Sequence, residues 1–217
     1  MASITSVTLE VADLTAAQDF YASAFALGPE LRLQETDAPT SGFRGFTLSL
    51  TVSQPADARA YLDAALAAGA TSIKPAAKSL WGFGGVVQAP DGTIWKVATA
   101  KKKDTGPASR AFDKIVLLLG ASDVAATKRF YVEHGLTVAR SFGRKYVEFE
   151  PASGAITLGL YGRRALAKDA GVPEAGSGSH RLLINGDVGS HSDPDGFRWE
   201  AVATHPATAP IQDVTVA

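Results

Sequence analysis

The chain of 217 residues has no cysteine and a single methionine. Without cysteine it can form neither disulfides nor thiolate metal sites, and it has no cysteine nucleophile. No run approaches the roughly 18 apolar residues of a membrane-spanning helix. The first residues also lack the charged and then apolar pattern of a signal peptide. We therefore expect a cytoplasmic protein with no membrane partner.

Charge of either sign is not in excess, because 21 Lys and Arg residues face 22 Asp and Glu residues, for a formal net charge of −1. Proteins that bind nucleic acids usually carry a basic excess, so we expect no nucleic-acid partner. What the chain does have is an ordinary globular composition, with 46% hydrophobic and 20% charged residues. Its length suits one large domain or two small ones.

Two short motifs occur twice, in the same order. In each copy an Asp stands seven positions before a Phe-Tyr pair, and a later Pro-Asp-Gly turn precedes a Trp. The first copy contains Asp13, Phe20, Tyr21 and Trp95, and the second contains Asp123, Phe130, Tyr131 and Trp199. Asp is a favoured helix N-cap, so each Asp predicts the start of a helix. We expect the four Phe and Tyr side chains to be buried in the core.

Hydrophobic periodicity predicts similar elements in both halves. The first half predicts helices at 14–25 and 57–68 and strands at 7–12, 31–35, 45–52, 84–88 and 94–98. The second half predicts a helix at 123–134 and strands at 115–121, 137–140, 146–149, 156–161 and 180–184. A polar insert at 163–179 contains a short helical stretch, and no helix in the second half matches 57–68.

The repeat and the composition between its copies predict four segments. They are an N-terminal module at 1–100, a charged and then Gly/Pro-containing linker at 101–111, a C-terminal module with an altered second half at 112–204, and a tail at 205–217.

A strand, an Asp-capped helix ending in Phe-Tyr, further strands and a closing Pro-Asp-Gly hairpin, present twice, resemble the vicinal oxygen chelate superfamily. This group includes glyoxalases, bleomycin-resistance proteins and extradiol dioxygenases, and the resemblance covers residues 3–203. It implies an α+β fold of two tandem βαβββ modules whose curved sheets enclose a cleft. Because both modules are in one chain, a monomer can complete that cleft, and a homodimer remains open.

The resemblance also implies a divalent metal held by the first and last strands of each module. Those positions fall on Ser6, Lys96, Lys114 and Glu200, of which only Glu200 is a usual ligand. A divalent ion about 4 Å from one ammonium would be repelled by roughly 8 kcal/mol at an effective dielectric of about 20. We therefore expect no metal or other cofactor, and an ion pair between Glu200 and Lys96 or Lys114. The alternative is that the lysines turn toward solvent.

Three aromatic residues are candidates for the wall of the cleft. Trp81 and Phe83 precede the closing hairpin, and Tyr161 is a possible hydroxyl donor. With the four strand positions they form the predicted ligand-binding set, since ligand pockets are mostly apolar with a few polar anchors. His180 has no evident orienting partner, so catalytic residues are not identified.

The predicted function is binding of a small organic molecule, of aromatic or anionic character, in the cleft, as implied by the bleomycin-resistance resemblance. One alternative is a lyase, isomerase or dioxygenase of the same superfamily, either metal-free or using rearranged metal ligands. Another is a structural or partner-binding protein whose cleft is closed by packing.

Overall fold

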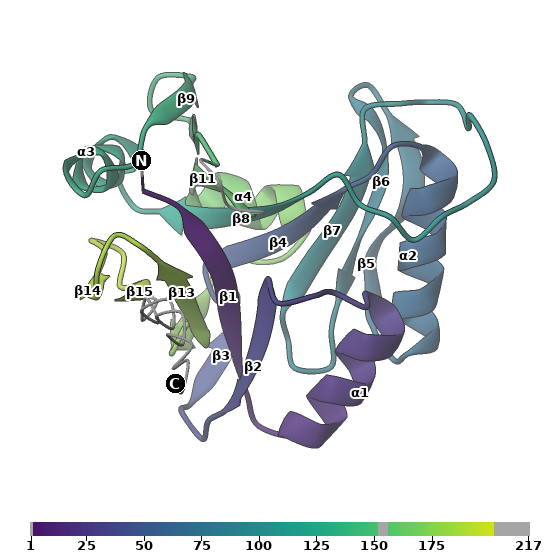
Figure 1. The fold of residues 1–217 in the computed structure, drawn as a ribbon, viewed down its shortest axis with the longest axis horizontal. Helices are drawn as coiled ribbons and strands as arrows, with labels where there is room; N and C mark the ends of the chain where they lie inside the picture. The colour runs from purple at the N-terminus through teal and green to yellow at the C-terminus, as the bar shows by residue number, and fades with distance from the viewer. Residues whose placement is uncertain (1, 152–155, 202–217) are drawn as a thin grey trace, which may run out of the picture.

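The computed structural model describes residues 2–151 and 156–201, so the predicted tail at 205–217 lies outside the described residues. The helices are α1 (Leu14–Ala24), α2 (Pro55–Ala67), α3 (Val124–Glu133) and α4 (Arg163–Ala170). None of the helices in these ranges is long and apolar enough to cross a bilayer. The strands form two larger sheets and one small one (Figure 1).

The larger sheet has eight strands. Their order is β5 (Thr71–Ser79), β6 (Gly82–Gln88), β7 (Ile94–Thr99), β4 (Phe46–Thr51), β8 (Lys114–Ala121), β11 (Ile156–Gly162), β10 (Tyr146–Phe149) and β9 (Val138–Ser141). In chain order, β4-α2-β5-β6-β7 and β8-α3-β9-β10-β11 are each a complete βαβββ module. The two modules join where their first strands, β4 and β8, pair antiparallel.

The second sheet has five strands. Their order is β14 (His191–Ser192), β15 (Arg198–Ala201), β13 (Leu182–Gly186), β1 (Ile4–Val11) and β2 (Leu31–Glu35). The chain passes from β13 to β14 without a helix, as the sequence predicts. The polar insert instead supplies α4 and β12 (Gly176–Gly178), which pairs with β3 (Thr40–Gly42) as a separate two-stranded sheet.

Each half of the chain contributes strands to both sheets. β1 of the first half pairs with β13 of the second, while β4 of the first half pairs with β8 of the second. The predicted segments 1–100 and 112–204 therefore describe the sequence repeat, whereas the complete βαβββ modules span 46–99 and 114–162. The α+β fold with curved sheets is as the sequence predicts.

Within each copy of the repeat, the helix contacts the closing hairpin through a buried tyrosine. The Tyr21 hydroxyl donates to Asp91 of the Pro-Asp-Gly turn at 3.2 Å, and the Trp95 indole donates to the same hydroxyl at 3.4 Å. In the second copy the Tyr131 hydroxyl donates to Asp193, the residue just before the Pro-Asp-Gly turn, at 2.7 Å, and the Trp199 indole donates to that hydroxyl at 3.2 Å. Burial raises the pKa of both tyrosines well above the ordinary value, so both hydroxyls stay protonated donors.

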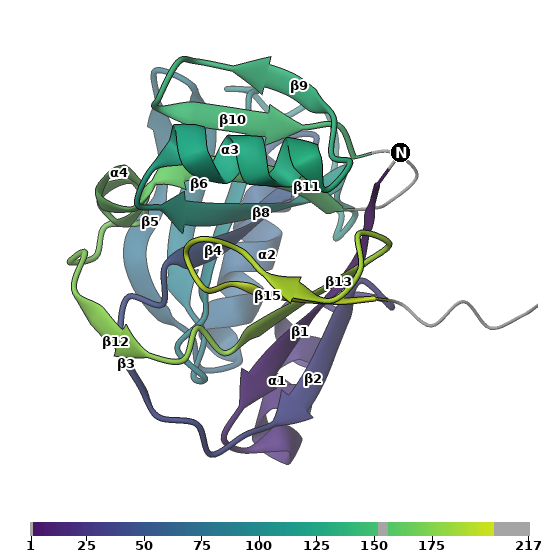
Figure 2. The same ribbon diagram turned by 90° about the vertical axis from the view of Figure 1, so that its left-hand side faces the viewer.

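The main core lies between the two sheets and receives α1, α2 and α3 (Figures 1 and 2). Phe20, Tyr21 and Tyr131 are buried in it, and Phe130 packs against it partly exposed. The predicted burial is thus confirmed for three of these aromatics. α4 lies on the opposite face of the eight-stranded sheet, against β4, β8 and β11.

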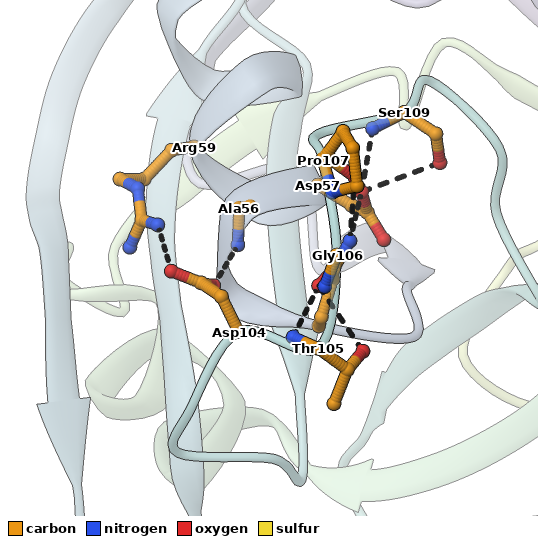
Figure 3. Close-up of polar contacts among 9 residues, drawn as sticks. Ala56, Asp57, Arg59, Asp104, Thr105, Gly106, Pro107 and Ser109 are labelled. Atoms are coloured by element: carbon orange, nitrogen blue, oxygen red, sulfur yellow. Dashed lines mark hydrogen bonds and ion pairs between the residues drawn. The ribbon is translucent and has the colours of Figure 1, made fainter.

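The predicted linker is bound along the start of α2 (Figure 3). One carboxylate oxygen of Asp104 accepts the Ala56 N–H at 2.6 Å, and the other accepts a hydrogen bond from Arg59 at 2.6 Å. Further along, the Asp57 carboxylate accepts the N–H of Ser109 at 2.7 Å. The Asp104 contact satisfies the Ala56 N–H, one of the helix N-terminal amides that otherwise lack partners, and the Asp57 contact holds the linker against the helix.

Candidate functional site

A cavity of about 440 Å³ lies on the face of the eight-stranded sheet that carries α4. Residues of β5, β6 and β7 form most of its wall, with Asp169 of α4 at one side and the loop between β5 and β6 at another. Its volume is in the usual range for small-molecule sites, roughly 300–1,000 Å³. The cavity therefore occupies the half of this face that belongs to the first complete module.

α4 fills the neighbouring part of the same face. Leu166, Ala167 and Ala170 pack with Val86 and Ile94 in a second apolar cluster. The helix ends at Gly171, whose φ of 87° is in the left-handed region. A Cβ at Gly171 would lie 2.7 Å from a side-chain carbon of Lys74, so glycine also allows the end of α4 to approach β5.

The cavity has a main-chain floor and an aromatic rim. Gly82 and Gly84 leave β6 without side chains there, and Gly82 adopts a φ of 141° that favours glycine. Trp81 stands at the rim with 85% of its surface exposed. A planar ligand lying on the glycine floor would be able to contact the Trp81 ring.

Two lysines and one aspartate face the cavity. The Lys96 ammonium donates to the Asp169 carboxylate at 2.9 Å, and both side chains are about one third to two fifths exposed. The Lys74 ammonium donates to the main-chain oxygens of Lys168 and Asp169, at 3.1 and 2.5 Å. Because two cations face one anion, the lining residues carry one excess positive charge.

A second ion pair lies further along the same sheet face. Lys114 of β8 is 3.7 Å from the Glu148 carboxylate, which also accepts a hydrogen bond from Tyr146 at 2.9 Å. Burial, followed by this contact with Glu148, raises the pKa of the Tyr146 hydroxyl. Between β7 and β8, the Ser49 hydroxyl of β4 is buried without a partner among the described residues.

The four predicted strand positions do not meet. Lys96 and Lys114 lie in the eight-stranded sheet, whereas Ser6 and Glu200 lie in the five-stranded sheet. There Asn185 of β13 pairs with Ser6 on one side and with Glu200 on the other. The expected ion pair of Glu200 with either lysine is therefore wrong, since Asp169 and Glu148 pair with them instead. The first and last strands of each half enter different sheets, which separates these residues.

The three predicted aromatics have three different environments. Trp81 and Phe83 both line the cavity, but the Phe83 side chain is buried in the main core, with the Arg59 guanidinium 5.3 Å from its ring centre. Tyr161 packs in the cluster around α4, in an edge contact with Tyr146 at 5.5 Å. Trp81 lies in the turn before β6, so its direction is not set by a strand, whereas Phe83 lies within β6 on the face that points to the main core.

The residues at the predicted metal positions do not fit a divalent ion. Lys96 and Lys114 are donors without lone pairs, and Ser6 and Glu200 are in the other sheet. Within 2–151 and 156–201, no three His, Asp or Glu side chains gather closely enough to hold a metal. The carboxylates on this sheet face are instead occupied by the two ammonium groups.

Sequence reasoning did not identify Lys74, Asp169, Glu148 or Ser49. Asp169 lies in the insert, where the repeat gives no counterpart to compare, and Lys74 lies in an exposed strand that was not predicted. The signal available was the insert itself, a polar stretch with a short helix that interrupts the repeat.

No family model and no curated protein matches the chain. Among solved structures, glyoxalase I from Zea mays is similar over 93% of this chain and 92% of its own, with a TM-score of 0.61 and 14% identity. A Bacillus subtilis protein provisionally named a dioxygenase is similar over 89% and 71%, with a TM-score of 0.52 and 12% identity. These likenesses show the glyoxalase-like, vicinal oxygen chelate fold.

Proposed function

We propose that this chain, whose fold is that of the vicinal oxygen chelate superfamily, binds a small planar organic anion in the cavity beside β6. The observation that carries the proposal is the pair of lysines, Lys74 and Lys96, which contact a single aspartate, Asp169, beside a glycine floor. No metal takes part in this binding, because the ammonium groups stand where a cation would be repelled.

The charge arrangement favours a carboxylate or a similar anion. The Lys96–Asp169 pair is partly exposed, and pairs of this kind contribute only about 0–1 kcal/mol. A ligand carboxylate is therefore able to share or replace Asp169 at Lys96 without a large loss. Charge-assisted hydrogen bonds to a partly enclosed ammonium then fix the orientation of the ligand.

The shape favours a flat ring. Gly82 and Gly84 present peptide planes, and Ala98 presents only a methyl group, so the floor is smooth. Trp81 adds an aromatic face at the opening, and aromatic pairs contribute about 0.5–1.5 kcal/mol beyond simple burial. The predicted aromatic ligand is retained in this proposal, with Trp81 as its contact and without Phe83 or Tyr161.

The lyase, isomerase or dioxygenase alternative requires an acid–base pair or a set of metal ligands at the ligand. The titratable side chains lining the described cavity are Lys74, Lys96 and Asp169, and the aspartate is bound by both lysines, through its carboxylate or its main chain. Binding without turnover is therefore the better supported proposal. Whether one chain or two form the working unit remains a prediction, either monomer or homodimer.

The test compares two probes of similar shape, 1-naphthoate and the neutral 1-naphthalenemethanol, by isothermal titration calorimetry. The wild-type protein is expected to bind the anion more tightly. Lys96→Met should weaken naphthoate binding about tenfold and leave the alcohol unchanged, because only the anion uses the ammonium. Trp81→Ala should weaken both probes.

Lys114→Met is the matched control, since Lys114 lies on the same sheet face but outside the cavity. It should leave both probes unchanged. Equal binding of the two probes, no binding of either, or equal losses in the two lysine variants would contradict the proposal. Recovery of a chemically altered probe would favour the enzymatic alternative instead.

A further inference from the structure

The turn between β5 and β6 presents two large apolar side chains to solvent. Leu80 is 79% exposed and Trp81 is 85% exposed, the highest values among the large hydrophobic residues described. The Ser79 hydroxyl accepts the Trp81 N–H at 3.2 Å, so the turn has a defined shape. Contact of two large apolar side chains with water is unfavourable, and exposed apolar patches commonly mark interaction surfaces.

A run of lysines lies beside this turn. A Cβ at Gly82 would overlap the Thr99 carbonyl oxygen, so the turn lies directly against the end of β7. The chain then continues into Lys101, Lys102 and Lys103, all of which are exposed. Lys78, two residues before Leu80, is exposed as well.

These four lysines carry charge that is not neutralised locally. None of them forms an ion pair with another residue in the described ranges. The acidic residue that follows them, Asp104, is bound to Arg59 at 2.6 Å. Four positive charges therefore gather next to Leu80 and Trp81 on a chain whose formal net charge is −1.

The lysine run is also held in place at both ends. It begins at the end of β7, and Asp104 fixes its other end to the first turn of α2 (Figure 3). In Figure 1 the strand ends, the start of the linker and the top of α2 lie along one edge of the molecule. The lysines and the apolar turn thus form one continuous surface, which we call the basic-aromatic edge: Lys78, Leu80, Trp81 and Lys101–Lys103.

We propose that the basic-aromatic edge binds the surface of an anionic phospholipid bilayer, with Leu80 and Trp81 inserted among the headgroups. Trp prefers the membrane–water interface because its ring is apolar and its N–H is polar. Each Lys near an anionic bilayer contributes a similar favourable electrostatic free energy of binding, so the contributions of the four lysines add. A surface contact of this kind requires no spanning helix.

A lipid surface fits these residues better than a nucleic acid does. Both partners supply negative charge, and bases are able to stack on Trp81. Leu80 has no role in such a complex, whereas a bilayer removes it from water. The numbers of acidic and basic residues in the chain are also nearly equal, whereas nucleic-acid-binding proteins usually have an excess of basic residues along the binding surface.

The experiment uses the full chain and vesicles of two compositions, phosphatidylcholine alone and phosphatidylcholine with phosphatidylserine in a 7:3 ratio. Binding is measured by co-sedimentation and by quenching of tryptophan fluorescence with brominated lipid. Trp95 and Trp199 are 0% and 2% exposed, so quenching reports on Trp81. We expect binding and quenching only with phosphatidylserine, both decreasing as salt is raised.

Two variants separate the charge from the apolar contact. Replacing Lys101, Lys102 and Lys103 by Gln together should lower partitioning about 100-fold, because three surface charges are lost. Leu80→Ser should lower it about tenfold. Phe142→Ser is the control, since Phe142 is 64% exposed at the turn between β9 and β10, outside the basic-aromatic edge. It should not change partitioning.

Two outcomes would overturn the inference. One is absence of binding to the phosphatidylserine vesicles at low salt. The other is binding of an oligouridylate probe that depends on the lysines but not on Leu80, with no quenching by brominated lipid. The naphthoate cavity is tested independently, because neither Leu80 nor Lys101–Lys103 lines it. Those variants should keep wild-type naphthoate binding whichever way the vesicle result falls.

Discussion

At the scale of single residues, the helix and the closing hairpin of each copy are joined by a buried tyrosine hydroxyl with two partners. The Tyr131 hydroxyl donates to one oxygen of Asp193 and accepts from the Trp199 indole, at 2.7 and 3.2 Å. In the first copy the corresponding bonds of Tyr21 are longer, at 3.2 and 3.4 Å. The motif residues are therefore constrained by hydrogen bonding as well as by apolar packing.

We predict that Tyr131→Phe lowers the free energy of unfolding by about 2 kcal/mol, because it leaves a buried carboxylate oxygen and an indole N–H without this partner. Tyr21→Phe is the matched variant and should cost about 1 kcal/mol, because its bonds are longer and hence weaker. Urea unfolding followed by circular dichroism measures both values. A larger loss in Tyr21→Phe than in Tyr131→Phe would contradict this account.

At the scale of elements, α2 depends on the segment that joins the two halves. Its N-cap residue, Gln54, makes no side-chain bond to the helix amides. The Asp104 carboxylate bonds the Ala56 N–H instead, and its charge suits the positive end of the helix dipole. The predicted linker therefore acts as a helix cap, which its position between two repeats did not indicate.

We predict that Asp104→Ala lowers the free energy of unfolding by about 1 kcal/mol, through loss of the cap and of the exposed pair with Arg59. Asp63→Ala, on the exposed side of the same helix, is the control. It should cost nothing or stabilise slightly, because alanine favours helix and an acidic group there gains nothing from the dipole. Thermal unfolding measures both variants, and an equal loss of stability in Asp104→Ala and Asp63→Ala would argue against a capping role for Asp104.

At the scale of the whole molecule, the two halves are paired in both of the larger sheets, and the short strands β3 and β12 add a third pairing. β1 pairs with β13 in one sheet, and β4 pairs with β8 in the other. Both pairings join the first half of the chain to the second, and one core lies between the sheets. Separating the halves would therefore leave the strands of all these pairings without their partners and expose part of that core at once.

We predict that neither residues 1–111 nor residues 112–217, produced alone, form a folded monomer. Unpaired edges of β1 and β4 are open to further pairing, so each half should self-associate. Mixed during refolding, the halves should recover a 1:1 complex with the circular dichroism of the intact chain. Light scattering after size exclusion measures the masses, and a monomeric half that unfolds cooperatively would disprove the prediction.

The repeat could be recognised from the sequence because its signals are local. Capping by Asp13 and Asp123 and the apolar periodicity of the helices depend on neighbours within a few residues, and both helices begin as predicted. Trp81 was predicted as a wall of the cleft from its place just before the closing hairpin, also a local signal, and it lines the cavity. The ion-pair partners of Lys96 and Lys114 could not be recognised in this way, because they lie far away in the sequence.

The sequence by itself thus determined the α+β fold, the missing helix after β13 and the burial of most motif aromatics, because short-range patterns specify these. Only the tertiary structure decided which strands became neighbours. It separated Ser6 and Glu200 from Lys96 and Lys114, and it brought Asp169 of the insert to Lys96. The register of distant strands depends on the packing of the whole chain, so the charge of the cavity could not be predicted from any local pattern.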